Sequence, residues 1–103
     1  MIFQEDENRW MLDLECVGVR AIVSTSALVA LATIRLPALK MTLINCPVFA
    51  SNGKRWVALP SKRETGWRYV PMIAFDSPDM LHEFGDAAIK AIERFAPAIF
   101  EGR

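Results

Sequence analysis

The residues of this chain that could do chemistry are concentrated between positions 53 and 69. This stretch, which we call the basic-aromatic loop, carries five basic residues, two tryptophans and a tyrosine, and its single acid is Glu64. Lysine and arginine neutralise phosphates, and flat aromatic rings stack on unpaired bases. We therefore predict that the loop contacts nucleic acid, DNA or RNA, through the following side chains: Lys54, Arg55, Lys62, Arg63, Trp67 and Arg68.

The same side chains also have ordinary structural uses. Trp56 lies in the middle of an expected strand, which favours a place in the core. Trp67 could clamp a hairpin, and the charges could serve only to keep an exposed loop soluble. The sequence therefore leaves both a binding role and a structural role open for this stretch.

No set of residues indicates catalysis. The single histidine, His82, stands beside Glu83 on an expected helix, without a nucleophile in a matching context. Asp76 and Asp79 look like a pair of carboxylates, but acids are common where a helix begins. The chain contains neither a Gly-rich phosphate loop nor a Gly-x-Ser-x-Gly elbow. We expect no catalytic residue, no small-molecule substrate and no enzymatic activity.

The cysteines do not indicate a metal site. Cys16 and Cys46 stand far apart in the chain, and neither belongs to a Cys-x-x-Cys pair. A structural zinc site takes about four ligands, commonly in closely spaced pairs. We expect two reduced, partly buried thiols and no metal or cofactor, with a disulfide as the less favoured alternative.

Length and composition indicate one small folded domain. The chain has 103 residues, of which 52% are hydrophobic and 23% charged, a balance that forms a core. A domain of this size buries a smaller share of its surface than a larger one, so we expect it to pair with itself. The zero net charge argues against a bulk electrostatic binder of nucleic acid. Charge is nevertheless segregated, with five acids against one base in residues 1–15 and five bases against one acid in residues 54–68.

Nothing in the sequence indicates a membrane or a secretory signal. The longest apolar run covers residues 27–32, whereas a spanning helix needs about 20 apolar residues. The first residues are acidic, and a secretory signal begins with basic ones. We therefore expect a cytoplasmic protein without membrane contact.

The hydrophobic pattern predicts strands followed by one helix. Alternating apolar and polar residues, interrupted by turn signals such as Asn52-Gly53, predict five strands, at residues 14–23, 28–36, 39–49, 55–59 and 67–75. Ser77-Pro78 predicts a helix start, Pro97 a helix stop, and apolar residues between them recur every three or four positions. We predict an α+β fold, an antiparallel meander sheet of about five strands with one C-terminal helix packed on it. Residues 1–13 would form an acidic arm and residues 14–103 a single domain.

Positions 55–63, which read Arg-Trp-Val-Ala-Leu-Pro-Ser-Lys-Arg, resemble the septation and stage V sporulation protein G family. That family has an aromatic residue, Val-Ala, an apolar residue, then Pro-Ser and a basic pair after a strand–Gly–strand hairpin. The similarity extends upstream through residues 28–34 and 43–49, and downstream through residues 68–73 and the closing helix. It covers about residues 14–96.

The resemblance implies a small bacterial homodimer, joined through β-strands, that binds DNA or RNA and acts in regulation. It also implies that binding involves the Pro-Ser-Lys-Arg region and the basic residue downstream of it, here Ser61, Lys62, Arg63 and Arg68. This sequence departs from the family where Val70-Pro71 replaces the usual His-Pro. The acidic arm has no clear counterpart, and an acidic arm over a basic loop would oppose phosphate.

Two hypotheses from different classes remain. The first is a nucleic-acid-binding homodimer that uses the basic-aromatic loop. The second is a protein-interaction module that docks a partner by its edge strands or by the apolar residues of the arm, Phe3, Trp10 and Met11.

Overall fold

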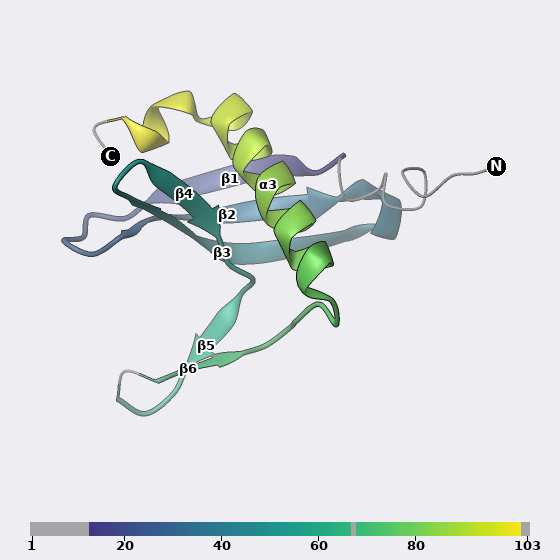
Figure 1. The fold of residues 1–103 in the computed structure, drawn as a ribbon, viewed down its shortest axis with the longest axis horizontal. Helices are drawn as coiled ribbons and strands as arrows, with labels where there is room; N and C mark the ends of the chain where they lie inside the picture. Colours follow the sequence, from purple (N-terminus) through teal and green to yellow (C-terminus); the bar gives the residue numbers. More distant parts are fainter. Residues whose placement is uncertain (1–12, 67, 102–103) are drawn as a thin grey trace.

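The computed structural model describes residues 13–66 and 68–101, and Figure 1 shows their arrangement. Four strands form an antiparallel sheet in the order β1-β2-β3-β4, and two further strands form a separate hairpin. The elements are β1 (Glu15–Ala21), β2 (Leu28–Leu36), η1 (Pro37–Leu39), β3 (Met41–Ser51), β4 (Lys54–Val57), β5 (Ser61–Arg63), β6 (Tyr69–Pro71), α3 (Pro78–Phe95) and η2 (Pro97–Phe100). The predicted α+β fold, a meander sheet with a C-terminal helix on it, is confirmed.

The sheet is a meander because each pair of neighbouring strands is joined by a short connection. Asn52 and Gly53 connect β3 to β4 with φ values of 53° and 80°. A tight hairpin turn needs left-handed backbone at both central residues, and asparagine and glycine tolerate it best. The turn predicted at this dipeptide is therefore confirmed.

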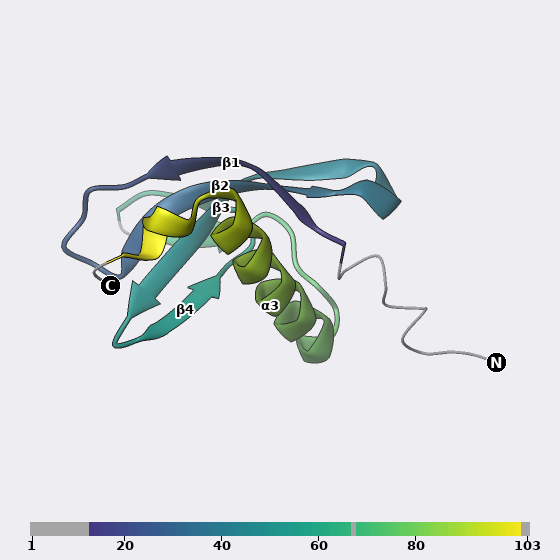
Figure 2. The same ribbon diagram turned by 90° about the horizontal axis from the view of Figure 1, so that it is seen from above.

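One face of the sheet forms the core with α3. The residues facing the helix alternate along the strands and are buried, among them Ala32, Ile34 and Val48, each fully inaccessible to solvent. The side chains between them point to the opposite face, which we call the open face. Figure 2 shows α3 on one side of the sheet only. The sheet is therefore half-buried, as expected for an antiparallel sheet with one solvated side.

The helix follows from local signals. The Ser77 hydroxyl accepts a hydrogen bond from the backbone N–H of Met80 at 3.4 Å, and Pro78 occupies the first helical position. Phe84 and Ile92 are buried against the sheet, and the helix ends just before Pro97. Within the described ranges no helix is long and apolar enough to cross a membrane.

The fifth strand differs from the expected one in its length and its partner. It was expected over residues 67–75 of the sheet, but β6 covers only Tyr69–Pro71 and pairs with β5, in a stretch expected to be a loop. Prolines lie at both ends of this hairpin, at Pro60 and Pro71, and proline donates no ladder hydrogen bond. The strongly polar β5 also has no apolar face to bury. The chain therefore leaves the sheet after β4 and folds back on itself.

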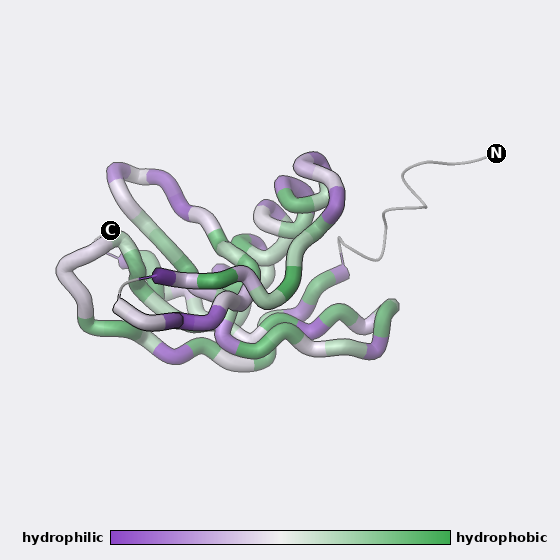
Figure 3. The backbone as a smooth tube through the Cα atoms, turned by 90° about the horizontal axis from the view of Figure 1, so that it is seen from below, coloured by the Kyte–Doolittle hydropathy of each residue, from purple (hydrophilic) through white to green (hydrophobic). Residues whose placement is uncertain are grey.

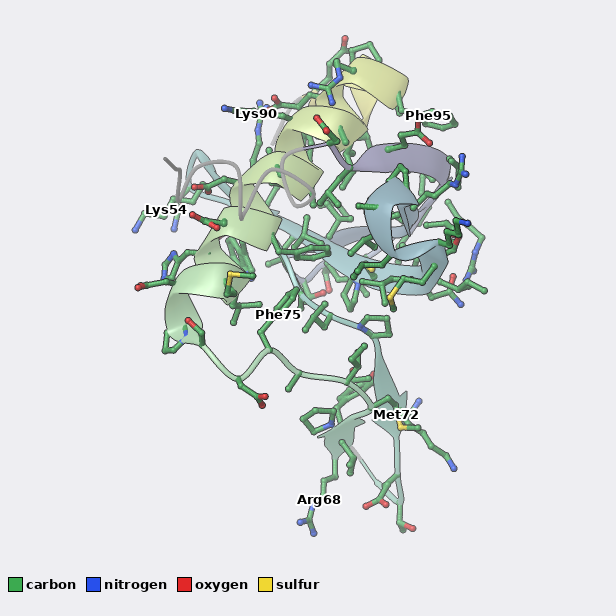
Figure 4. The ribbon with its side chains drawn as sticks, turned by 90° about the vertical axis from the view of Figure 1, so that its right-hand side faces the viewer. Lys54, Arg68, Met72, Phe75, Lys90 and Phe95 are labelled. Atoms are coloured by element: carbon green, nitrogen blue, oxygen red, sulfur yellow. The ribbon has the colours of Figure 1, made fainter. Side chains whose placement is uncertain are left out.

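The base of the β5–β6 hairpin is held by apolar residues. Leu59 and Phe75, which flank the hairpin in sequence, are partly buried against the core. The Phe75 ring contacts the Phe84 ring with 5.6 Å between centroids. Figure 4 shows Phe75 directed toward the body of the molecule and Arg68 at the outer end of the hairpin. The hairpin thus projects from the domain but is anchored at its stem.

Candidate nucleic-acid interface

The hairpin presents four of the predicted site residues on two faces. Cross-strand pairs share a face, and Arg63 pairs with Tyr69 while Lys62 pairs with Val70. The Glu64 N–H donates to the Arg68 carbonyl oxygen at 2.7 Å, which continues the ladder and places Arg68 on the face of Lys62. Ser61 is two residues before Arg63 and therefore shares the face of Arg63 and Tyr69. All four predicted residues, Ser61, Lys62, Arg63 and Arg68, are exposed.

The loop of the hairpin is shaped by Gly66 and Arg63. Gly66 has a φ of 75°, a left-handed conformation that favours glycine. The Arg63 Nε donates a hydrogen bond to the Gly66 carbonyl oxygen at 3.1 Å. Arg63 therefore contributes to the loop conformation as well as to its charge. Trp67 lies outside the described residues, and its role in stacking stays a prediction.

The other two predicted residues, Lys54 and Arg55, lie elsewhere. Figure 4 shows Lys54 well separated from Arg68, which lies at the outer end of the hairpin. The Arg55 guanidinium donates to the Glu93 carboxylate at 2.5 Å and lies 4.5 Å from the centre of the Phe100 ring. The basic residues of positions 53–69 therefore form two groups, one at the β3–β4 turn and one on the hairpin, and not a single patch.

Trp56 was expected in the core, and this prediction is wrong. Its side chain is 43% exposed on the open face, where its ring stacks on Phe49 with centroids 5.3 Å apart and an interplanar angle of 12°. Side chains alternate along β4, so Arg55 and Val57 point toward the helix and Trp56 points away from it. β4 has only four residues, which is too few for its alternation of side chains to show from the sequence which ones face the core.

A groove of about 680 Å³ lies between the open face and the hairpin. The hairpin contributes Ser61, Arg63 and Tyr69. The remaining lining residues come from the first half of the chain and from the residue that follows β4: Ser26, Leu28, Leu31, Asn45, Pro47, Phe49 and Ala58. Sequence reasoning missed Asn45 and Phe49 as possible site residues. No local signal could have found them, because only the folded sheet brings them to the hairpin.

Asn45 owes its position in the groove to a β-bulge. The register between β2 and β3 shifts between Ala32 and Ile34, so that two residues of β3, Ile44 and Asn45, oppose the single residue Thr33. Asn45 has a φ of 63°, which asparagine tolerates better than most residues. The bulge places a side-chain amide at an apolar groove.

The cysteines and acids form no metal site in the part of the chain that the structure describes. Cys16 and Cys46 are free and buried. Burial raises the pKa of both thiols, that of Cys46 to about 12, with a further contribution from neighbouring Cys16. The thiol of Cys46 therefore stays protonated near neutral pH, and the less favoured disulfide does not form in this structure.

No family model matches the chain, and no curated protein matches it. The resemblance to the septation and stage V sporulation protein G family stays a prediction.

Proposed function

We propose that this chain is a small cytoplasmic, bacterial, nucleic-acid-binding protein that acts in regulation as a homodimer. The proposal extends to membership of the septation and stage V sporulation protein G family, which the chain resembles. The β5–β6 hairpin is the contact with DNA or RNA, and the protein has no enzymatic activity, cofactor or membrane contact.

The observation that carries the proposal is the exposure of the hairpin cations. Lys62, Arg63 and Arg68 lie within seven residues on a projecting hairpin that contains a single acid, Glu64. Figure 3 shows that hydrophilic residues gather toward the tip of this hairpin. A polyanion can reach cations on a projecting element from several directions, and the phosphate backbone supplies most of the affinity of a non-specific binder.

Self-association is supported by the edges of the sheet. β1 and β4 end the order of the four-stranded sheet, and within residues 13–66 and 68–101 no further strand pairs with their outer edges. β1 is the longer of the two, with seven residues, and carries the half-exposed Val17. Two β1 edges related by a two-fold axis pair antiparallel, and a pairing centred on Gly18 would bring Glu15 of one copy near Arg20 of the other. Such a dimer would carry two hairpins.

The proposal is tested by fluorescence anisotropy with labelled single-stranded and duplex DNA and RNA at two salt concentrations. Reversing Lys62 and Arg68 to glutamate should abolish binding and leave the melting temperature nearly unchanged, because both side chains are exposed. The matched control reverses Lys90 and Arg94, one lysine and one arginine exposed on α3, and should bind like the wild type. Binding that ignores both salt and the hairpin reversal would sink the proposal.

The second candidate function is a protein-interaction module. It is favoured by the outer edge of β1, with which no strand of the described residues pairs. The apolar residues of the arm, the other part of this hypothesis, lie outside the described residues. Deleting residues 1–12 separates the candidates. Loss of self-association or partner capture with nucleic-acid binding retained would assign the arm to protein contacts, whereas unchanged self-association would leave the arm without that role.

A further inference from the structure

We propose that the groove between the open face and the hairpin receives unpaired bases of single-stranded nucleic acid, with the Tyr69 ring as the stacking surface. This inference rests on the proposed function and narrows it from nucleic acid in general to single strands. Tyr69 is 59% exposed and lines the groove opposite the strands of the sheet.

The lining of the groove has the chemistry that a base requires. Phe49 and Tyr69 supply aromatic surface, and Leu31 and Pro47 supply further apolar surface. Asn45 offers a carboxamide, which both donates and accepts hydrogen bonds and so matches the polar edge of a base. A volume of about 680 Å³ lies within the range of ligand pockets, about 300–1,000 Å³.

The charges at the groove favour an anionic ligand. Arg63 lies in the lining, and none of the lining residues is acidic. Lys62 and Arg68 lie on the other face of the same hairpin. A nucleotide chain with its bases in the groove would meet Arg63 there, and its phosphates would meet Lys62 and Arg68 where the chain crosses the edge of the hairpin. Cations for phosphates beside an aromatic surface for bases are the combination that single-strand binders use.

Base pairing decides which form of nucleic acid can use this groove. Bases in a duplex are stacked on their neighbours, so a protein reaches only their edges in the grooves of the double helix. A base can lay its flat face on Tyr69 only when it is unpaired. The groove therefore contributes affinity for single strands, and the hairpin cations contribute affinity for both forms.

A second copy of this chain fits the groove less well than a nucleotide. In a symmetric dimer the same surface faces itself, so the lining would meet a second lining of the same composition. That lining contains no acid, so a second copy would bring no carboxylate to the Arg63 guanidinium. The edge of β1 offers self-association without covering the groove.

The affinities of Tyr69→Ala and Tyr69→Phe for a labelled oligothymidylate and for the matching duplex test the inference. The oligothymidylate has about 15 nucleotides, near the upper site size of single-strand binding folds. Loss of one stacked base weakens binding by about 5- to 150-fold, the equivalent of about 1–3 kcal/mol. We expect that loss for Tyr69→Ala with the single strand only, and nearly wild-type binding for Tyr69→Phe, which keeps the ring.

A second pair of variants tests the groove without touching Tyr69. Ser26 is exposed and lines the groove, whereas its neighbour Thr25 is exposed and does not. Ser26→Glu should weaken single-strand binding more than Thr25→Glu, because only the former adds a negative charge to the lining. Circular dichroism melting checks that all the variants are folded.

The outcomes separate this inference from the proposed function. If the wild type binds with salt dependence and hairpin reversal abolishes binding, but Tyr69→Ala and Ser26→Glu change nothing, the groove inference alone fails. Equal losses of single-strand and duplex binding in Tyr69→Ala would also overturn it, because they would show that Tyr69 only supports the hairpin. Conversion of a dimer to a monomer by Tyr69→Ala would assign the groove to a second copy. If the wild type binds no nucleic acid, both proposals fall.

Discussion

Arg55→Gln tests whether the second group of basic residues is structural. The Arg55 guanidinium touches both Glu93 on α3 and the Phe100 ring of η2, so it links β4 to the end of the chain. A cation over an aromatic ring at a partly exposed site contributes about 0.5–1 kcal/mol. A partly exposed ion pair adds about 0.2–1 kcal/mol, and here both side chains are 40% exposed. The two contacts together stabilise the fold by about 0.7–2 kcal/mol.

The assay is thermal unfolding followed by circular dichroism. For a domain of this size each kcal/mol shifts the melting temperature by about 4–8 °C, so Arg55→Gln should melt clearly below the wild type. Glu93→Gln and the Arg55→Gln/Glu93→Gln double variant complete a double-mutant cycle. The coupling free energy between the two residues should not exceed the contribution of the ion pair, about 0.2–1 kcal/mol. Lys54→Gln, on the same strand, is the matched control and should melt like the wild type.

The binding assay completes this test. Arg55→Gln should bind nucleic acid with nearly wild-type affinity, because its side chain is held by the body of the domain. An unchanged melting temperature together with a loss of affinity as large as that of Lys62→Gln would refute the reasoning. Arg55 would then be a nucleic-acid contact, as its sequence context suggests.

Two further predictions concern the core and the helix. The pKa of Cys46 is raised from 9.0 to about 12 by burial, so the free energy of unfolding should fall as the pH rises from about 9 toward 12, where the unfolded thiol ionises first. Urea unfolding should show a shallower fall for Cys46→Ala, and an equally steep fall would contradict the assignment. Removing the helix cap with Ser77→Ala should cost about 1 kcal/mol in the same assay. Thr65→Ala, exposed in the hairpin loop, should cost much less, and equal losses would argue against the cap.

Elements with strong local signals could be predicted from the sequence. Ser77-Pro78 and Pro97 bracket α3 because capping and the missing proline N–H act within a few residues. Asn52-Gly53 determined the β3–β4 turn for the same reason, since the need for positive φ is local. The order of the strands followed from these turns.

Features that depend on long-range contacts could not be predicted. The expected fifth strand was placed in the main sheet, but β6 pairs with β5 instead. Strand pairing depends on which strands the rest of the fold brings close, and the residues of one strand do not show this. The bulge at Asn45 shifts the register by one residue and reverses the face of the side chains beyond it. The groove needs this bulge, the open face and the hairpin together.

The candidate site was predicted in part. The cluster of Lys62, Arg63 and Arg68 follows from their closeness in sequence and lies on one hairpin. Closeness in sequence was misleading for Arg55, because the chain turns away after β4 and its side chain is held by Glu93. Closeness in sequence therefore does not predict which arginines of this stretch lie together in the fold.

The central claim is that the hairpin cations meet phosphates, and the salt dependence of binding tests it most directly. The logarithm of affinity for a single strand falls with the logarithm of salt concentration by about 0.7 for each neutralised phosphate. Replacing Lys62 and Arg68 by glutamine should therefore make the slope shallower by about 1.4, while Lys90→Gln with Arg94→Gln leaves it unchanged. Identical slopes for the wild type and the hairpin variant would contradict the claim.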